Sequence, residues 1–390
     1  AERKDESAAW ASEKAGYPIQ IGEAGLYWFD LFPKLMVTDI SVMQAEPAIG
    51  ELFTAEELYI GVDLIASLQQ RTLVVDSARV SGLQLGILRS ADGNFSLIGL
   101  KGKTAEQAFD ESQIDWAEQL QSWRDIELLS ANIQFEDELQ PQLSGLYTLN
   151  ELALIQAKKS KLIGDIQLPH HLGQQLSFII EAGLTSAGVT NWQINQLDAS
   201  QLQLAAIFQD QQLHDVSVTS GRADLRLDTG SMLKKQWRGQ IQLTDVSLAN
   251  LNKPEVEAVN IETMSGQFTW EGEASAWQLI ADPIQLTIAG ESWPQSTLNL
   301  QFSELDGLVA ESSFMRLSDV TSLALLSNKA PALLTQYQPA GDIRELRLSL
   351  DSDNKIQSAK MVADEFASLP VEEMPGVTGL SLQLEWQPGS

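Results

Sequence analysis

The chain has 390 residues, of which 44% are hydrophobic and 20% charged, a composition typical of globular proteins rather than of disordered ones. Acidic residues outnumber basic residues by 53 to 25, and the resulting net charge of -28 disfavours binding to nucleic acid and to strongly anionic membrane surfaces. The absence of cysteine excludes disulfides, thiolate metal sites and cysteine nucleophiles.

No stretch of the chain approaches the ~18 to 20 apolar residues that cross a bilayer, and no signal peptide opens it. The chain begins Ala1-Glu2-Arg3-Lys4, without a methionine. We therefore expect a processed protein or an excised piece, with any membrane anchor outside this sequence.

The first elements predicted are a short helix and a series of short strands. Residues 5–14 begin with a capping residue, Asp5 or Ser7, and precede Gly16, which predicts a helix. Residues 63–71 predict a brief helical corner. The predicted strands are separated by turn residues and lie at 19–21, 35–42, 58–62 and 73–75.

A β-hairpin is predicted over residues 80–100. The dipeptide Asp92-Gly93 is typical of a two-residue type I′ turn, and apolar residues alternate with polar or small ones on both sides of it. One face of this hairpin is therefore apolar, and it packs either against protein or against a ligand. The apolar residues are Leu83, Leu85, Ile87, Phe95 and Leu97.

Two stretches carry helical patterns. Trp116, Leu120 and Trp123 recur at helical spacing and predict an amphipathic helix over 113–123. A second helical interval covers 318–337, with Ser318 or Asp319 as its cap and Pro331 in the first turn of a second helix.

The chain after residue 124 is otherwise dominated by one-sided strands. Each alternates apolar with polar residues, which is typical of an antiparallel sheet with one solvated face. The helix between every pair of strands that a parallel α/β fold needs is missing. We predict a mainly β fold: a long curled antiparallel sheet that forms an open, apolar-lined groove, with a few short helices. The strands lie at 126–128, 202–204, 225–227, 241–243, 284–288, 298–302, 346–350 and 380–386.

No pattern for a chemical reaction or a metal emerges. The three histidines are His170, His171 and His214, and the adjacent pair after Pro169 is interpreted as a surface loop. Residues 351–354 lack the glycine and the distal glutamate of a calcium loop and predict a polar turn. The acidic clusters at 136–138 and 372–373 are interpreted as solvated loops. The sequence therefore predicts no catalytic residue, no metal, no cofactor and no enzyme.

Both ends of the chain carry motifs in a characteristic order. The N-terminal motifs are Gly16-Tyr-Pro-Ile-Gln-Ile-Gly22, Phe32-Pro33-Lys-Leu35-Met-Val-Thr-Asp39-Ile-Ser-Val42, Leu58-Tyr-Ile-Gly-Val62-Asp-Leu64, and Gly82-Leu-Gln-Leu85 leading to Asp92-Gly-Asn-Phe95. The later motifs are Trp277-Gln-Leu279 through Trp293-Pro294, Pro339-Ala-Gly341 before Leu346-Arg-Leu348, and Met374-Pro-Gly376-Val-Thr-Gly379-Leu380. Their order resembles the AsmA-like proteins of Gram-negative bacteria, most closely the YhdP branch.

This resemblance implies a chorein-like, bridge-type lipid-transfer fold that is tethered to the inner membrane and lies in the periplasm. It implies a non-enzymatic role: conducting phospholipids between the inner and outer membranes, with envelope proteins as further partners. The domains expected are a chorein-like β region with a short leading helix at 1–100, a helical insertion at 101–125, and a continuous β-groove at 126–390 with a helical interlude near 318–338.

Two main hypotheses follow. In the first, the apolar faces of the strands bind phospholipid acyl chains. In the second, they close into an ordinary core of a structural scaffold or adhesin-like protein; an enzyme on a β scaffold is a third alternative. The candidate lipid-binding residues are Leu83, Leu85, Ile87, Phe95, Leu97, Leu202, Leu204, Leu225, Leu227, Ile241, Leu243, Ile284, Leu286, Ile288, Leu298, Leu300, Leu346, Leu348 and Leu350.

Overall fold

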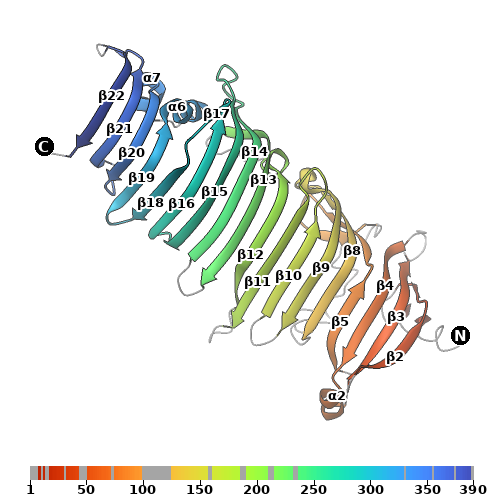
Figure 1. The fold of residues 1–390 in the computed structure, drawn as a ribbon. Helices are drawn as coiled ribbons and strands as arrows, with labels where there is room; N and C mark the ends of the chain where they lie inside the picture. Colours follow the sequence, from red (N-terminus) through yellow and green to blue (C-terminus); the bar gives the residue numbers. More distant parts are fainter. Residues whose placement is uncertain are drawn as a thin grey trace. The chain divides into compact units, whose positions relative to one another are not determined.

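The chain forms two compact units, residues 1–195 and 196–390, in a computed structural model (Figure 1). The described residues are mainly β, with mostly antiparallel strands and four short α-helices, as the sequence predicts. The structure describes residues 8–9, 12–13, 17–29, 32–43, 51–71, 74–98, 124–156, 160–184, 190–209, 215–231, 236–328, 331–353, 355–372 and 375–387.

Unit 1 contains a sheet in which most strands that follow one another in the sequence also pair with one another. Its strands are β1 (Ile19–Gln20), β2 (Ala24–Phe29), β3 (Phe32–Met43), β4 (Glu51–Val62), β5 (Val75–Ser81), β6 (Gln84–Arg89), β7 (Phe95–Leu97), β8 (Asp125–Asp137), β9 (Gly145–Gln156), β10 (Ser160–Gln167) and β11 (Gln175–Leu184). A single 3-10 turn, Pro141–Leu143, joins β8 to β9, and helix α2 (Leu64–Gln70) follows β4.

The exception to antiparallel pairing lies beside β8. Strands β5 and β6 run one after the other along the same edge of β8, and both pair with it in parallel. Gly82, with a φ of 65°, lies in the break between them. Parallel neighbours cannot be joined by a hairpin turn and require a longer crossover connection.

All the strand pairings among the described residues of unit 2 are antiparallel. Its strands are β12 (Thr190–Gln203), which begins in unit 1, β13 (Val216–Ser231), β14 (Gln236–Asn250), β15 (Val259–Glu273), β16 (Ala276–Ile288), β17 (Glu291–Ser292), β18 (Ser296–Ser303), β19 (Gly307–Arg316), β20 (Ala340–Leu350), β21 (Ile356–Ser368) and β22 (Val377–Trp386). Helix α5 (Leu204–Ile207) follows β12, and α6 (Leu317–Leu326) and α7 (Ala332–Tyr337) separate β19 from β20.

In several long strands of both units, apolar and polar residues alternate between the two faces, and this alternation shifts by one residue at a single point in the strand. In β14, Ile241 and Leu243 share one face with Val246, because Asp245 between them adopts a positive φ of 54°. Such a residue costs about 1–2 kcal/mol, but it rotates the following stretch so that apolar side chains stay on one face. The equivalent residues in the other strands have φ between 50° and 55° and are Asp39, Ser130, Gln201, Glu345 and Glu365.

The predicted helices are confirmed where the structure describes them. The corner after β4 is helix α2, whose N-cap Asp63 accepts hydrogen bonds from the backbone N–H groups of Ile65 and Ala66. The interval 318–337 contains α6 and α7. The N-cap of α6 is Arg316, so the predicted cap at Ser318 or Asp319 is wrong, and Pro331 lies at the N-cap of α7, one position before its predicted place in the first turn. Of the leading helix, only residues 8, 9, 12 and 13 are described, and they are helical. The predicted helix 113–123 lies outside the described residues.

The predicted hairpin forms between β6 and β7, but its turn differs from the prediction. The N–H of Gly93 donates to the carbonyl of Ser90, and the N–H of Ser90 donates to the carbonyl of Asn94. Gly93 alone adopts a positive φ, 89°, whereas a type I′ turn needs two such residues. The loop therefore has three residues, a tight turn followed by a glycine in the left-handed region.

Candidate functional site

The apolar side chains of unit 1 share one face of its sheet. Directly paired residues on neighbouring strands project their side chains to the same side, so the register shows which residues align. One such line crosses eight strands, about 34 Å at ~4.8 Å per strand, and is apolar at every position. It consists of Leu26, Leu35, Ile60, Ala78, Ile126, Leu154, Leu162 and Ile180.

Unit 2 has a similar arrangement, in which Gly239 and Ser312 are the two positions without an apolar side chain. One line of paired residues crosses β14 to β22, and another crosses β12 to β20. Neither line includes a residue of β17. The first line consists of Trp237, Trp270, Leu279, Leu300, Ala310, Leu348, Ala359 and Trp386. The second consists of Leu197, Leu227, Gly239, Phe268, Ala281, Leu298, Ser312 and Leu346. We call the side of the sheet that bears these lines the apolar face of unit 2.

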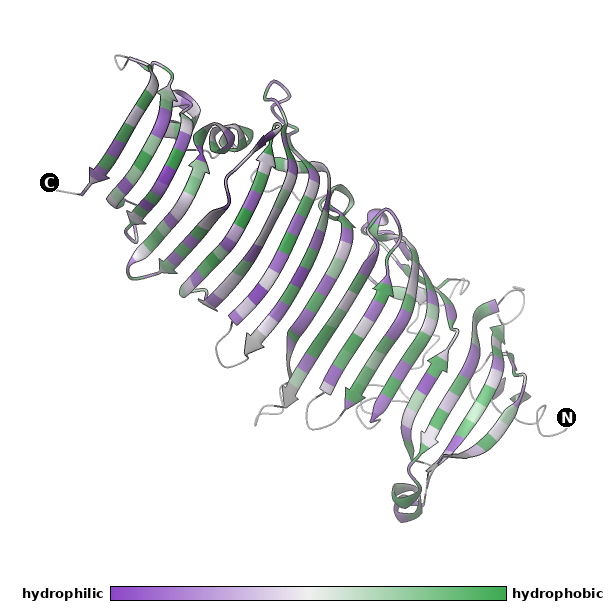
Figure 2. Cartoon of the chain, in the orientation of Figure 1, coloured by the Kyte–Doolittle hydropathy of each residue, from purple (hydrophilic) through white to green (hydrophobic). Residues whose placement is uncertain are grey.

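The opposite face of unit 2 is polar. Its corresponding line consists of Asp228, Arg238, Thr269, Ile280, Asn299, Glu311, Arg347, Lys360 and Glu385. Figure 2 shows the resulting bands, in which hydrophobic and hydrophilic residues alternate along the strands. Arg347 and Glu311 form an exposed ion pair on this face, with a nitrogen–oxygen distance of 3.3 Å.

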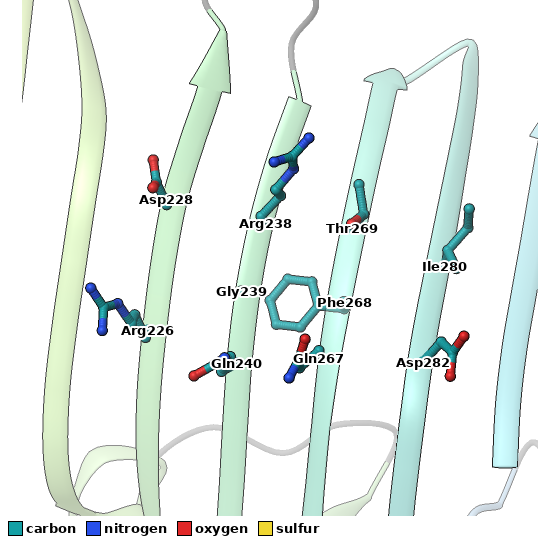
Figure 3. A pocket seen from close by; sticks show the side chains of 10 residues that line it. All are labelled: Arg226, Asp228, Arg238, Gly239, Gln240, Gln267, Phe268, Thr269, Ile280 and Asp282. Atoms are coloured by element: carbon teal, nitrogen blue, oxygen red, sulfur yellow. The ribbon is translucent and has the colours of Figure 1, made fainter.

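A shallow cavity of about 310 Å³ lies among the polar side chains of β13 to β16 (Figure 3). Two arginines and two aspartates line it, so their charges balance, and Gly239 and Phe268 are its only members from the apolar lines. The lining residues are Arg226, Asp228, Arg238, Gly239, Gln240, Gln267, Phe268, Thr269, Ile280 and Asp282. A second depression, at Thr297, Asn299 and Glu311, also lies on polar side chains.

Helix α6 covers one end of the apolar face of unit 2. Leu326 is fully buried and packs with Val246, Val259, Ile261 and Ile288. At the other end of the helix, Leu317 packs with residues of β20 and β21. Figure 1 shows α6 at the ends of the strands opposite the turn that joins β15 to β16.

Polar contacts fix α6 in this position. The side-chain amide of Asn250 donates to the carbonyl of Leu326 at 2.6 Å, and the indole N–H of Trp293 donates to Asp319 at 2.6 Å. Asp319 is 9% exposed, and this burial raises the pKa of its carboxyl, although the hydrogen bond from Trp293 and the charge of Arg316 oppose the shift.

The structure divides the predicted lipid-binding residues of unit 2 into two sets. One set packs in the clusters around α6, and only Ile288 in it is buried; it consists of Leu204, Leu243, Leu286, Ile288 and Leu346. The other set is half-buried outside those clusters and consists of Leu202, Leu225, Leu227, Ile241, Ile284, Leu298, Leu300, Leu348 and Leu350. Leu204 begins helix α5, so the predicted strand 202–204 ends one residue early.

The predicted residues of unit 1 are less uniform. Leu85 and Ile87 align with Ile133 and Phe135 of β8, and Leu97 pairs with Ile87. Leu83 lies in the break between β5 and β6, outside both strands. Phe95 is 56% exposed and pairs with Arg89 at the end of the hairpin.

Glycine and phenylalanine form matched pairs on both apolar faces. Gly164 is paired with Phe178, and Gly239 with Phe268. In each pair the aromatic ring occupies the space into which a side chain on the glycine would project. The ring therefore lies close over the neighbouring strand. None of these four residues is among the predicted site residues. Their signal in the sequence is a glycine at a position of a strand where the alternation calls for an apolar side chain.

The predicted solvated loop at 136–138 is wrong for its central residue. Asp137 is 3% exposed, ends β8 and forms an ion pair with Arg89. Burial raises the pKa of this carboxyl, but hydrogen bonds from Arg89 and from the backbone N–H groups of Gln140 and Leu139 outweigh it, and the pKa falls below its usual range. Asp137 is therefore an ionised structural residue.

The other polar predictions agree with the structure where it describes them. His170 and His171 are exposed in a turn after Pro169, and His171 hydrogen-bonds the carbonyl of Gln142. Asp351 opens a polar turn by accepting from the N–H groups of Asp353 and Lys355. Within the described ranges, no group of three or more histidine, aspartate or glutamate residues could hold a metal ion.

These observations define a class of protein: a mainly β chain with an apolar face on the sheet of each unit and, in unit 2, a polar face on the opposite side. A family model described as YhdP protein matches residues 2–390, so the chain belongs to the YhdP family. Membership of this AsmA-like family indicates a role in lipid transport in the Gram-negative envelope. The search of curated proteins returned no match. No helix among the described residues is long and apolar enough to span a membrane.

Proposed function

We propose that the chain conducts phospholipids between the inner and outer membranes as the periplasmic part of a protein that is anchored in the inner membrane. The acyl chains lie against the apolar faces of the sheets, which act as the walls of a groove, while the head groups remain in water. The observation that carries this proposal is the set of apolar register lines, each of which crosses eight strands.

The direction of these lines supports movement as well as binding. Each acyl methylene that leaves water for an apolar surface contributes about 0.8 kcal/mol. Successive strands present Leu279, Leu300 and Leu348 at equivalent positions in the line, so a chain that shifts to the next strands keeps similar contacts. Sliding across the strands then requires little net free energy, and no covalent bond forms or breaks.

The two-sided character of the sheet supports an exposed apolar face. Residues that follow one another, such as Leu300 and Gln301 or Arg347 and Leu348, project to opposite faces. The polar face and the net charge of -28 keep the chain soluble while the apolar face contacts lipid. Because no covalent bond forms or breaks when lipid slides along this face, the function we propose is non-enzymatic.

A structural scaffold is the second candidate, and the cluster around Leu326 favours it. There the apolar face is closed by α6 in the manner of an ordinary core. If the remaining face is also closed in the working protein, it binds no lipid. A hydrophobic dye whose fluorescence rises in apolar surroundings separates the two: after delipidation, an open face binds it and a closed core does not.

Photocrosslinking from neighbouring residues tests the transport proposal. A photoreactive amino acid is placed at Leu300 or at Leu348, and the matched controls carry it at Gln301 or Arg347, one residue away on the polar face. We expect phospholipid adducts from the two leucine positions in living cells, with little labelling from the controls. Equal labelling of both faces, or no lipid adduct at Leu300 and Leu348, contradicts the proposal.

A further inference from the structure

The apolar face of unit 2 contains a strip with two well-defined ends. At one end, Leu243, Met264 and Leu286 are paired across β14, β15 and β16 and pack against the cluster that contains Leu326 of α6. An acyl chain lying along the strands cannot extend past this row without displacing the helix. Helix α6 therefore closes one end of the strip.

The other end of the strip is aromatic. Trp237 pairs with Trp270, and Trp277 pairs with Phe302 in a stacked arrangement, with ring centroids 5.7 Å apart and an interplanar angle of 27°. Trp237 and Trp277 are the second residues of β14 and β16, so these rings lie close to the hairpin turns. Among the residues that the structure describes, none accepts a hydrogen bond from the indole N–H of Trp270 or Trp277.

Tryptophan suits the boundary between hydrocarbon and water, because its ring is apolar and its N–H is a donor. In bilayers it gathers at the level of the lipid head groups for this reason. The ester and phosphate oxygens of a phospholipid supply the acceptors that Trp270 and Trp277 lack. The aromatic end of the strip therefore matches the polar end of a lipid.

The length of the strip matches a membrane acyl chain. Six residues separate Met264 from Trp270 on β15, and six separate Leu243 from Trp237 on β14. At ~3.3 Å per residue this is about 20 Å. The hydrocarbon of one leaflet is about 15 Å deep, half of a bilayer core. Chains in a fluid leaflet are kinked, so the same chain drawn out along a strand is longer than this depth and approaches the length of the strip. Gly266 lies midway along the strip, where an added Cβ would meet only ordinary contacts, which leaves room for the chain.

We infer that this strip measures acyl chains: the ester end of a phospholipid lies at Trp237, Trp270 and Trp277, its chains run along the strands, and their methyl ends stop against the residues under α6. The inference rests on the proposed function and adds a selection by chain length. Chains shorter than the strip leave apolar surface uncovered, and longer ones must fold back or expose their ends.

Binding of lipids with different chains tests the measurement of length. The delipidated chain is mixed with equal amounts of phosphatidylethanolamines whose acyl chains have about 12, 16 or 22 carbons, and bound lipid is counted by native mass spectrometry. We expect the intermediate chain to be preferred by about tenfold over the shortest. Met264→Ala should shift the preference towards the longest chain, whereas Ile241→Ala, in the middle of the strip beside Gly266, should lower binding of all three.

The outcomes separate the two proposals. If phospholipid binds without regard to chain length, or if Met264→Ala leaves the preference unchanged, the selection by length is wrong while lipid binding stands. If no phospholipid of any length binds, the proposed function itself fails. Thermal unfolding of Met264→Ala and Ile241→Ala shows that both variants are folded before their binding is compared.

The orientation of the lipid is tested in the unaltered protein. Phosphatidylethanolamine with a photoreactive group at the methyl end of one chain should label residues 259–264 and α6. The same lipid with the group in its head should label residues 270–277. The reverse distribution, or equal labelling of both segments by both probes, overturns the inference.

Discussion

The two ends of the apolar face of unit 2 are built from the same alternating strands but differ in what covers them. Towards α6, Val246, Ile261 and Ile288 are buried with Leu326 in a closed cluster. Further along the same strands, Ile241 and Leu279 are only half-buried and belong to no buried cluster. One pattern of residues thus produces a protein core at one end and an accessible apolar surface at the other, and a single helix makes the difference.

The largest expected contrast is in stability. Leu326→Ala removes a side chain that has no exposed surface, and it should lower the free energy of unfolding by about 2–5 kcal/mol. Ile241→Ala, on the half-buried strip, should cost about 1 kcal/mol or less. Urea unfolding of both variants measures the difference. Similar losses at the two sites would show that the strip is as closed as the covered end.

The next largest effect concerns the two glycines of the strip. A Cβ on Gly239 meets the ring of Phe268, so Gly239→Ala should destabilise the chain by about 1–3 kcal/mol through overpacking. Gly266 is the matched control, since the nearest atom to its added Cβ is a carbonyl oxygen at 3.4 Å. Gly266→Ala should therefore be close to neutral. Thermal unfolding compares them, and a larger loss at Gly266 would refute the assignment of the ring to Gly239.

A smaller effect is expected from pH at the covered end. Burial raises the pKa of Asp319, so the folded chain binds its proton more tightly than the unfolded chain does. The stability that this residue contributes is then greatest below its ordinary pKa of about 3.9 and is lost as pH rises through the folded pKa. Asp319→Asn cannot titrate. The melting temperature of the unaltered chain should rise relative to this variant as pH falls from 7 to about 4.

The unaltered chain and Asp319→Asn share all other titratable groups, so the effects of those groups cancel in the difference between the two melting temperatures. A difference that stays constant with pH, or that changes in favour of the variant on acidification, would contradict the raised pKa of Asp319.

The smallest effect is expected on the polar face. The ion pair of Arg347 with Glu311 is exposed, so Arg347→Ala should change the free energy of unfolding by less than about 1 kcal/mol. It should leave phospholipid binding unchanged. Its neighbour Leu348 lies on the apolar face, and Leu348→Ala should lower lipid binding at similar stability. Loss of lipid binding in Arg347→Ala would show that the lipid binds to the polar face, which contradicts the proposed function.

The sequence predicted the fold class because alternation is a local property. The alternation around Leu298 and Leu300 is enough to show a strand with one apolar face. Even the shift in the alternation has a local signal: in Leu243-Thr-Asp-Val246 the apolar residues are three apart with two polar residues between them. The same spacing recurs in Val37-Thr-Asp-Ile40 and Ala363-Asp-Glu-Phe366, and the sequence analysis overlooked it.

What covers a strand is not a local property, and this limited the prediction of the site. Leu243 and Ile241 belong to the same alternation, yet only Leu243 packs against the cluster under α6, which lies some 80 residues later in the chain. Asp137 is similar, because its partner Arg89 is 48 residues away. Neither neighbourhood is visible in the residues that surround Leu243 or Asp137 in the sequence.

The apolar lines run along the hydrogen-bonding direction of the sheet, so the backbone sets their spacing and the side chains only need to be apolar. Leucine, isoleucine, valine and methionine can therefore replace one another along a line while the path persists. A family with such a sheet can diverge widely in sequence and keep its function. Deleting one residue within β15 would be far more damaging than many such exchanges, because every side chain beyond the deletion would change faces.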